Sequence, residues 1–166
     1  MKRIILFLLF VPCLLFAQDV NDLRKNAERN NTAESWNILA KYYSEKGVDT
    51  TALRKTAEQA YSLALKEKNN KEIGKALIFL SESYFNQGKW EEYIKKNEEA
   101  LTFSKLSLDA DLQRETLINI GYAYNSTGEY DKAISTYNKS INISLRNNRR
   151  DSHLANSYIN TAFAFL

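Results

Sequence analysis

The stretch Leu117-Ile-Asn-Ile-Gly-Tyr-Ala-Tyr124 decides the fold, because its pattern recurs at a regular spacing along the 166-residue chain. In each of three copies a tyrosine is followed four residues later by a glycine: Tyr43 and Gly47, Tyr84 and Gly88, Tyr124 and Gly128. The interval between these glycines is nearly constant, and a fourth copy, Tyr158-Ile-Asn-Thr-Ala-Phe-Ala-Phe165, begins where the same interval places it. Repetition of this kind, with a period of roughly 40 residues, is the sequence signature of stacked helical units.

The residues around these glycines predict pairs of helices. Between Ala33 and Lys46 the apolar residues have helical spacing, and Thr32 before them is a typical helix N-cap. Each glycine is expected to end the first helix of a pair, since glycine adopts the left-handed closing conformation without a Cβ penalty. No long stretch alternates apolar and polar residues, so we predict an all-α fold without strands.

The third copy resembles the tetratricopeptide repeat (TPR) family closely. Its motif reads Leu117-x-x-Ile120-Gly121-x-x-Tyr124, then Gly128-x-Tyr130, then Ala133-x-x-x-Tyr137. HEAT and armadillo repeats have periods nearer the one seen here, but the motif outweighs the period, because about two extra helical turns would lengthen the common TPR unit of ~34 residues to this size. The closing proline of the family is missing, so the Asn-rich loops are expected to form the turns between repeats.

This resemblance implies a right-handed solenoid of helical hairpins with three full repeats and a half repeat. The expected repeats span about 33–70, 71–110, 111–150 and, in part, 151–166, and residues 18–32 form an N-terminal lead-in, with Val20, Leu23 and Ala27 on one side. Long-period arrays of this kind resemble the input arrays of bacterial signalling proteins.

The N-terminal segment 1–17 predicts a secretory signal peptide. Lys2 and Arg3 precede an unbroken apolar run from Ile4 to Phe16, and the small Ala17 offers a cleavage site. The run is shorter than the ~20 residues of a membrane span, and an uncleaved anchor is the alternative. Lipidation of Cys13 is disfavoured, because a proline precedes it. We therefore expect export to the periplasm or cell envelope of a bacterium.

Composition argues against chemistry within the exported chain. Cleavage would remove the only cysteine and the only proline, and would lower the formal net charge from +3 to +1 because Lys2 and Arg3 leave with the signal. A nearly neutral chain lacks the basic face that nucleic-acid binding needs. His153 is the only histidine, in a predicted polar turn, and neither a metal-ligand cluster nor a phosphate-binding loop is evident. The sequence thus predicts a protein that is not an enzyme, needs no cofactor and binds no nucleic acid.

The resemblance implies that a protein or peptide partner binds in the groove lined by the first helix of each repeat. The family's groove positions fall on Asn37, Lys41, Lys75, Ile78, Glu82, Phe85, Glu115, Ile118, Tyr122, Asn125, Ile159 and Phe163. The groove is expected to grade from polar at the first repeat to apolar and aromatic near the C-terminus. Packing between repeats is the alternative role for its apolar members. The Lys/Asn/Arg clamp for chaperone C-termini is not expected, because other residue types occupy several of its positions.

The last helix, ending Thr161-Ala-Phe-Ala-Phe-Leu166, is apolar and has no partner helix after it. Because terminal repeats need a polar outer face, we expect either a fragment of a longer protein or self-association through this helix. The expected function is an exported protein–protein interaction array, the N-terminal sensory or scaffold part of a longer TPR signalling protein. A free-standing periplasmic scaffold or adaptor without signalling output is the alternative.

Overall fold

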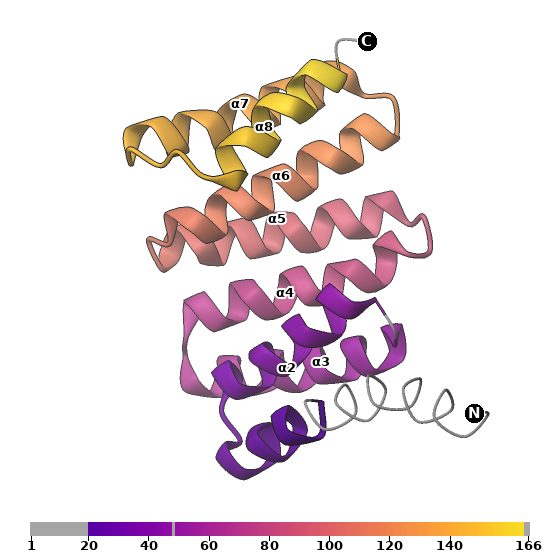
Figure 1. Cartoon of the computed structure of the whole chain (residues 1–166), viewed down its shortest axis with the longest axis vertical. Coiled ribbons are helices and arrows are strands. Elements are labelled where there is room, and N and C mark those ends of the chain that lie inside the picture. Colours follow the sequence, from indigo (N-terminus) through magenta and orange to yellow (C-terminus); the bar gives the residue numbers. More distant parts are fainter. Residues whose placement is uncertain (1–19, 48, 165–166) are drawn as a thin grey trace, which may run out of the picture.

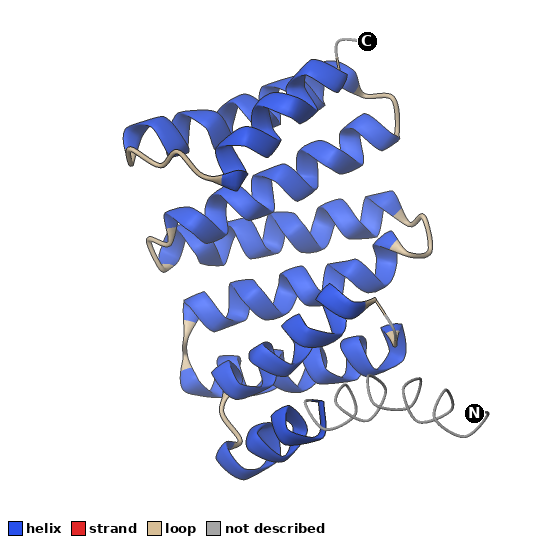
Figure 2. Cartoon of the chain, viewed as in Figure 1, coloured by secondary structure: helices blue, strands red, loops and turns tan. Residues whose placement is uncertain are grey.

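The computed structural model describes residues 20–47 and 49–164, which form helices and short turns and contain no strand (Figure 2). A helical segment over residues 20–30 comes first. The helices that follow are α2 (Ala33–Lys46), α3 (Thr50–Glu67), α4 (Asn70–Phe85), α5 (Trp90–Leu106), α6 (Ala110–Ser126), α7 (Tyr130–Arg146) and α8 (Ser152–Phe163). Consecutive helices run back and forth and stack along the long axis of the molecule (Figure 1). The predicted all-α fold with three helical hairpins and a further half repeat is confirmed.

The packing of the helices gives the stack an inner and an outer side. Each helix packs on its neighbours in sequence, and in addition α2 contacts α4, α4 contacts α6, and α6 contacts α8. The second helices of the hairpins, α3, α5 and α7, form no comparable contacts with one another over the described residues. The first helices therefore lie closer together and line the inner face of the solenoid, which is the arrangement that the predicted groove requires.

The start of α2 follows the predicted capping chemistry, whereas α5 and α7 begin without a side-chain cap. Thr32 caps α2 by accepting a hydrogen bond from the backbone N–H of Ser35, whose hydroxyl in turn accepts one from the backbone N–H of Thr32. Asp109 and Asp151 cap α6 and α8 through the N–H groups of Leu112 and Leu154. The two aspartates also hold neighbouring repeats together, because Asp109 pairs with Lys71 and Asp151 pairs with Arg114.

The turns within repeats match the prediction, and those between repeats only partly do. Gly47, Gly88 and Gly128 have φ of 61°, 67° and 78°, the left-handed conformation expected of them. The turns between repeats are also left-handed, and the residues at those positions are Lys68, Leu108 and Asn148, with φ of 53°, 55° and 51°. Only the last of these is an asparagine, so the Asn-rich loops explain one turn directly.

The core is assembled from small, aliphatic and aromatic side chains. Around α2 and α3, Leu39 and Tyr43 pack with Ala27 of the 20–30 segment, so the lead-in is part of the folded array. In the third repeat a Cβ on Gly121 would lie 2.5 Å from the ring of Tyr137, which is fully buried. The glycine of the signature is thus required by helix packing. In the part of the chain that the structure describes, no helix is long and apolar enough to cross a membrane. The predicted signal peptide lies outside the described residues.

Candidate functional site

The inner face carries a cavity of about 590 Å³ between α2, α4, α6 and the start of α8, which we call the acidic groove. Its lining is mainly charged, and most of the charged groups are carboxylates. The lining residues are Glu34, Asn37, Ile38, Lys41, Ser44, Glu45, Lys71, Lys75, Ile78, Phe79, Glu82, Asp109, Asp111, Leu112, Glu115 and His153.

One side of the acidic groove is built by contacts between α2 and α4. The side-chain amide of Asn37, only 3% exposed, donates to the carbonyl oxygen of Glu72 at 3.0 Å and to its Oε2 at 2.8 Å. Lys75 Nζ binds the other carboxylate oxygen of Glu72 at 2.7 Å. Asn37 therefore holds two repeats in register as well as lining the groove. The amide oxygen of Asn37 accepts no hydrogen bond from the described residues.

Two partly buried carboxylates on the inner face lack a basic partner among the described residues. Glu82 accepts a hydrogen bond from the Ser44 hydroxyl at 2.9 Å. Burial raises the pKa of Glu82, and the nearby charge of Glu115 raises it further, against the hydrogen bond from Ser44. Burial also raises the pKa of Glu115, although the charges of His153 and Lys41 act in the opposite direction. Both charges are thus held in an environment that disfavours them.

A second cavity, of about 540 Å³, continues along the same helices toward the C-terminal ends of α2, α4 and α6; we call it the aromatic hollow. Its lining is Tyr43, Ser44, Gly47, Thr50, Leu53, Glu82, Phe85, Asn86, Tyr93, Ile118, Asn119 and Tyr122. The ring of Phe85 lies 5.6 Å from the rings of Tyr93 and Tyr122, and 5.5 Å from that of Trp90. Phe85 and Tyr122 are 36% and 42% exposed, so these rings remain available to a ligand.

The structure brings most of the predicted groove residues together. Asn37, Lys41, Lys75, Ile78, Glu82 and Glu115 line the acidic groove, and Glu82, Phe85, Ile118 and Tyr122 line the aromatic hollow. Three predicted residues, Asn125, Ile159 and Phe163, line neither of these two cavities. Ile78 is 2% exposed and belongs to the apolar core, which fits the packing alternative.

The gradient of polarity has a different direction from the predicted one. The sequence placed the polar end at the first repeat and the apolar end at the last. In the structure both ends involve α2, α4 and α6, and the change from charged to aromatic runs along the helix axes. The reason is that side-by-side helices align their N-terminal and C-terminal halves across repeats, a relation that a reading along the chain does not reveal.

Exposed apolar side chains on α8 remain outside this site. Tyr158, Ile159 and Phe163 are each more than half exposed. Self-association through this helix stays a prediction, which sedimentation of the purified protein would test.

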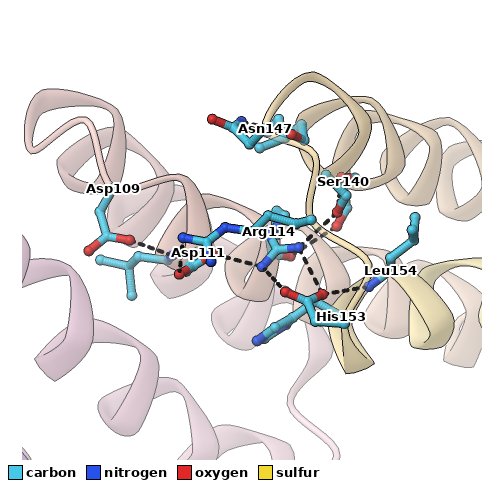
Figure 3. A network of polar contacts seen from close by, with 12 residues as sticks. Asp109, Asp111, Arg114, Ser140, Asn147, His153 and Leu154 are labelled. Carbon is cyan, nitrogen blue, oxygen red and sulfur yellow. Dashed lines mark hydrogen bonds and ion pairs between the residues drawn. The ribbon is translucent and has the colours of Figure 1, made fainter.

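Sequence reasoning missed the buried Arg114 of α6 and its network of polar contacts (Figure 3). Arg114 is 1% exposed and donates to both carboxylate oxygens of Asp151, at 2.9 and 2.7 Å. It also binds Asp111 Oδ1 at 2.7 Å and the Ser144 hydroxyl at 3.0 Å. Hydrogen bonding by Arg114 lowers the pKa of Asp151 to about 2. This network links α6, α7 and α8. Its one signal in the sequence is an arginine among the small and apolar residues that occupy the inner positions of α6.

His153 also lies differently from the prediction. It belongs to the first turn of α8, is half-buried and lines the acidic groove, whereas the sequence placed it in a polar turn. Within the described residues, no group of three histidine, cysteine, aspartate or glutamate side chains could hold a metal ion. The linings of the two cavities offer charged and aromatic contacts.

The helices form an all-α solenoid of helical hairpins. In the comparison with known proteins, the tetratricopeptide repeat family matches residues 72–146 of this chain. These residues are tetratricopeptide repeats, and the helices on either side continue the same solenoid. A fold of this family is an interaction scaffold that generally binds proteins or peptides. No curated protein matches the sequence significantly.

Solved structures with a similar fold include a signal-transduction ATPase. The apo form of RapI matches with a TM-score of 0.71 and 18% identity, over 80% of this chain and 47% of RapI. A STAND signal-transduction ATPase with a tetratricopeptide repeat sensor, from Pyrococcus horikoshii, matches with a TM-score of 0.68 and 19% identity, over 90% of this chain and 24% of that protein. MamA matches with a TM-score of 0.58 and 20% identity, over 94% of this chain and 79% of MamA. The match thus spans about half of RapI and a quarter of the ATPase.

Proposed function

We propose that this chain is an exported bacterial interaction array whose inner face binds an extended segment of a partner protein. The observation that carries the proposal is the continuity of the two cavities, which share Ser44 and Glu82. Together they make an elongated depression in which charged contacts give way to aromatic contacts along the helix axes of α2, α4 and α6. Such a surface suits a peptide, which can place successive side chains along it.

Selection from a random peptide library displayed on phage tests the binding part of this proposal. The library is exposed to the immobilised protein at neutral pH, with a heat-unfolded sample as the control. Enrichment of related peptides on the folded protein alone is the expected result. If no peptide is enriched over the unfolded control, the inner face is not a peptide-binding groove.

Export rests on the N-terminal sequence. Lys2, Arg3 and the apolar run from Ile4 to Phe16 form the charged and apolar parts of a secretory signal, and Ala17 supplies its cleavage site. N-terminal sequencing of the protein from an expressing bacterium should start at Gln18. An intact Met1, or a fatty acid on Cys13, would rule out this processing.

A signalling role is the finer part of the proposal. The Pyrococcus horikoshii ATPase carries a tetratricopeptide repeat sensor, so an array of this fold is suited to serve as the input part of a longer signalling protein. The competing role is a free-standing scaffold or adaptor in the envelope. The genomic sequence around the coding region separates the two, because a signalling protein needs a membrane span and an output domain in the same reading frame.

A further inference from the structure

The lysines of the acidic groove have ion-pair partners, whereas some of its carboxylates do not. Its three lysines each have an acidic neighbour: Lys71 Nζ lies 2.7 Å from Asp109, Lys75 Nζ lies 2.7 Å from Glu72, and Lys41 Nζ lies 3.7 Å from Glu45. No lysine or arginine of the described chain pairs with Glu82 or Glu115. The lysines of the groove are therefore already engaged, whereas its exposed Glu34 and its partly buried Glu82 and Glu115 have no lysine or arginine partner in the described chain.

The fold gains little from these two carboxylates. Glu115 forms no hydrogen bond or ion pair with a described residue, and Glu82 has only the Ser44 hydroxyl. Partial burial disfavours both charges, and the charge of Glu115 disfavours that of Glu82 further. A ligand that carries positive charge and several N–H donors would compensate both carboxylates.

The exposed rings of the aromatic hollow lie further along the same helices than the two carboxylates. On α4, Glu82 precedes Phe85 by three residues, which is ~4.5 Å along the helix axis. On α6, Glu115 precedes Tyr122 by seven residues, or ~10 Å. An extended peptide advances ~3.3 Å per residue, so one to three residues cover this separation. A basic side chain on the carboxylates would thus leave a nearby side chain of the same peptide over the exposed rings.

Resting on the proposed function, we propose that the inner face binds an extended peptide with a lysine or arginine one to three residues from an aromatic or large aliphatic side chain. Glu82 and Glu115 bind the cation, and Phe85 and Tyr122 bind the apolar side chain. An acidic peptide is the wrong ligand for this surface, because its carboxylates would face Glu82 and Glu115 with no unengaged lysine of the described groove nearby.

The test compares the wild-type protein with two variants and a matched control in the same library selection. Glu115→Gln removes one unpaired charge and keeps the side-chain shape. Glu92→Gln makes the same change at an exposed position on α5, outside both cavities. Tyr122→Ala removes an exposed ring of the aromatic hollow. Circular dichroism shows that each variant is folded before the peptides that it selects from the library are sequenced.

We expect the wild-type protein and Glu92→Gln to select a basic residue near an aromatic or aliphatic one. A synthetic selected peptide should bind about tenfold more tightly than its twin with glutamate in place of the basic residue. Glu115→Gln should largely abolish this charge preference, and Tyr122→Ala should weaken the preference for the apolar residue.

Selection of acidic or uncharged peptides would overturn the inference and leave the peptide-binding groove intact. So would a charge preference that survives Glu115→Gln unchanged. An absence of any enriched peptide would overturn the proposed function together with this inference, so the two failures are distinguishable.

Discussion

The junction between repeats two and three and the junction between repeats three and four use equivalent helices in the same register, with different chemistry. Gly74 in α4 and Arg114 in α6 occupy equivalent positions of successive repeats. A Cβ on Gly74 would lie 2.8 Å from the Leu112 side chain and 3.5 Å from the carbonyl oxygen of Ala100, so that junction has no room for a side chain. At the next junction the buried side chain of Arg114 fills the equivalent space.

At both junctions a basic residue of one repeat pairs with the aspartate that caps the first helix of the next repeat. Asp109 pairs with Lys71, whose side chain is 51% exposed, and Asp151 pairs with Arg114, whose side chain is 1% exposed. The aspartates differ in the opposite sense, since the side chain of Asp109 is 16% exposed and that of Asp151 is 37% exposed. An ion pair with an exposed lysine contributes little, whereas removing a buried arginine also removes packing and leaves its partners without a donor. The same junction of the repeat architecture thus accepts either close apolar packing or a buried arginine with acidic partners, and the two should differ in their sensitivity to mutation and acid.

The largest effect is expected when the chemistry of one junction is placed in the other. Gly74→Arg inserts a long charged side chain where a Cβ alone is too close to Leu112, and Asp109 of that junction already binds Lys71. We expect a loss of about 3 kcal/mol or more in the free energy of unfolding, from overpacking and a poorly paired charge. Urea denaturation measures it. Gln59→Arg, on the exposed surface of α3, is the control, and equal midpoints for the two variants would refute the packing argument.

Removing each cation should show that the two ion pairs are unequal. Arg114→Ala leaves a cavity and deprives Asp151, Asp111 and Ser144 of a donor, so a loss of about 2–4 kcal/mol is expected. Lys71→Ala removes an exposed partner, and the expected loss is less than about 1 kcal/mol. The same denaturation experiment measures both. Similar losses for the two variants would mean that burial of Arg114 does not strengthen the second junction.

Acid should weaken the junction of repeats three and four. Arg114 holds the pKa of Asp151 at about 2 in the folded protein, below the ~3.9 of an unfolded aspartate. A lowered folded pKa means that the stabilisation is present above about pH 4 and is lost as the pH falls toward 2. Thermal unfolding across this range should therefore show a smaller acid-dependent loss in Asp151→Asn, which keeps a helix cap. An identical acid profile in both proteins would contradict the assignment.

The smallest effect concerns the turns of the same two junctions. Leu108 has a φ of 55° and is 87% exposed, whereas Asn148 occupies the equivalent turn with a φ of 51°. Leucine is strained in this conformation and asparagine tolerates it, so Leu108→Asn should raise stability by about 0.5–1 kcal/mol. Asn148→Leu should lower it by a similar amount. Thermal melts of both variants measure this, and a Leu108→Asn protein that melts below the wild type would show that leucine is not strained there.

The contrast between these turns also explains what the sequence could predict. Gly47, Gly88 and Gly128 indicate left-handed turns because glycine is the residue that adopts them freely. Lys68 and Leu108 adopt the same conformation without any such signal, because the packing of the helices on either side imposes it. The all-α fold was predictable for a related reason, since helical spacing and caps are local properties of the chain.

Many individual residues of the inner face could be predicted from the sequence, but their arrangement as a surface could not. The resemblance to the repeat family selected lining positions on α2, α4 and α6, among them Glu82, Glu115 and Tyr122. The contributions of Lys71 and His153 were missed, because they depend on how neighbouring repeats are superposed. Arg114 was missed for the same reason, since its partners in α7 and at the start of α8 are distant in the sequence.

Chemical-shift mapping by NMR of the isotopically labelled protein, with a library-selected peptide, tests the central claim most directly, because it reports which side chains the ligand touches. We expect the largest shifts at the residues that join the two cavities and at their unpaired groups and exposed rings: Ser44, Glu82, Phe85, Glu115 and Tyr122. Shifts concentrated at Tyr158, Ile159 and Phe163 on α8, or on the outer helices α3, α5 and α7, would contradict it.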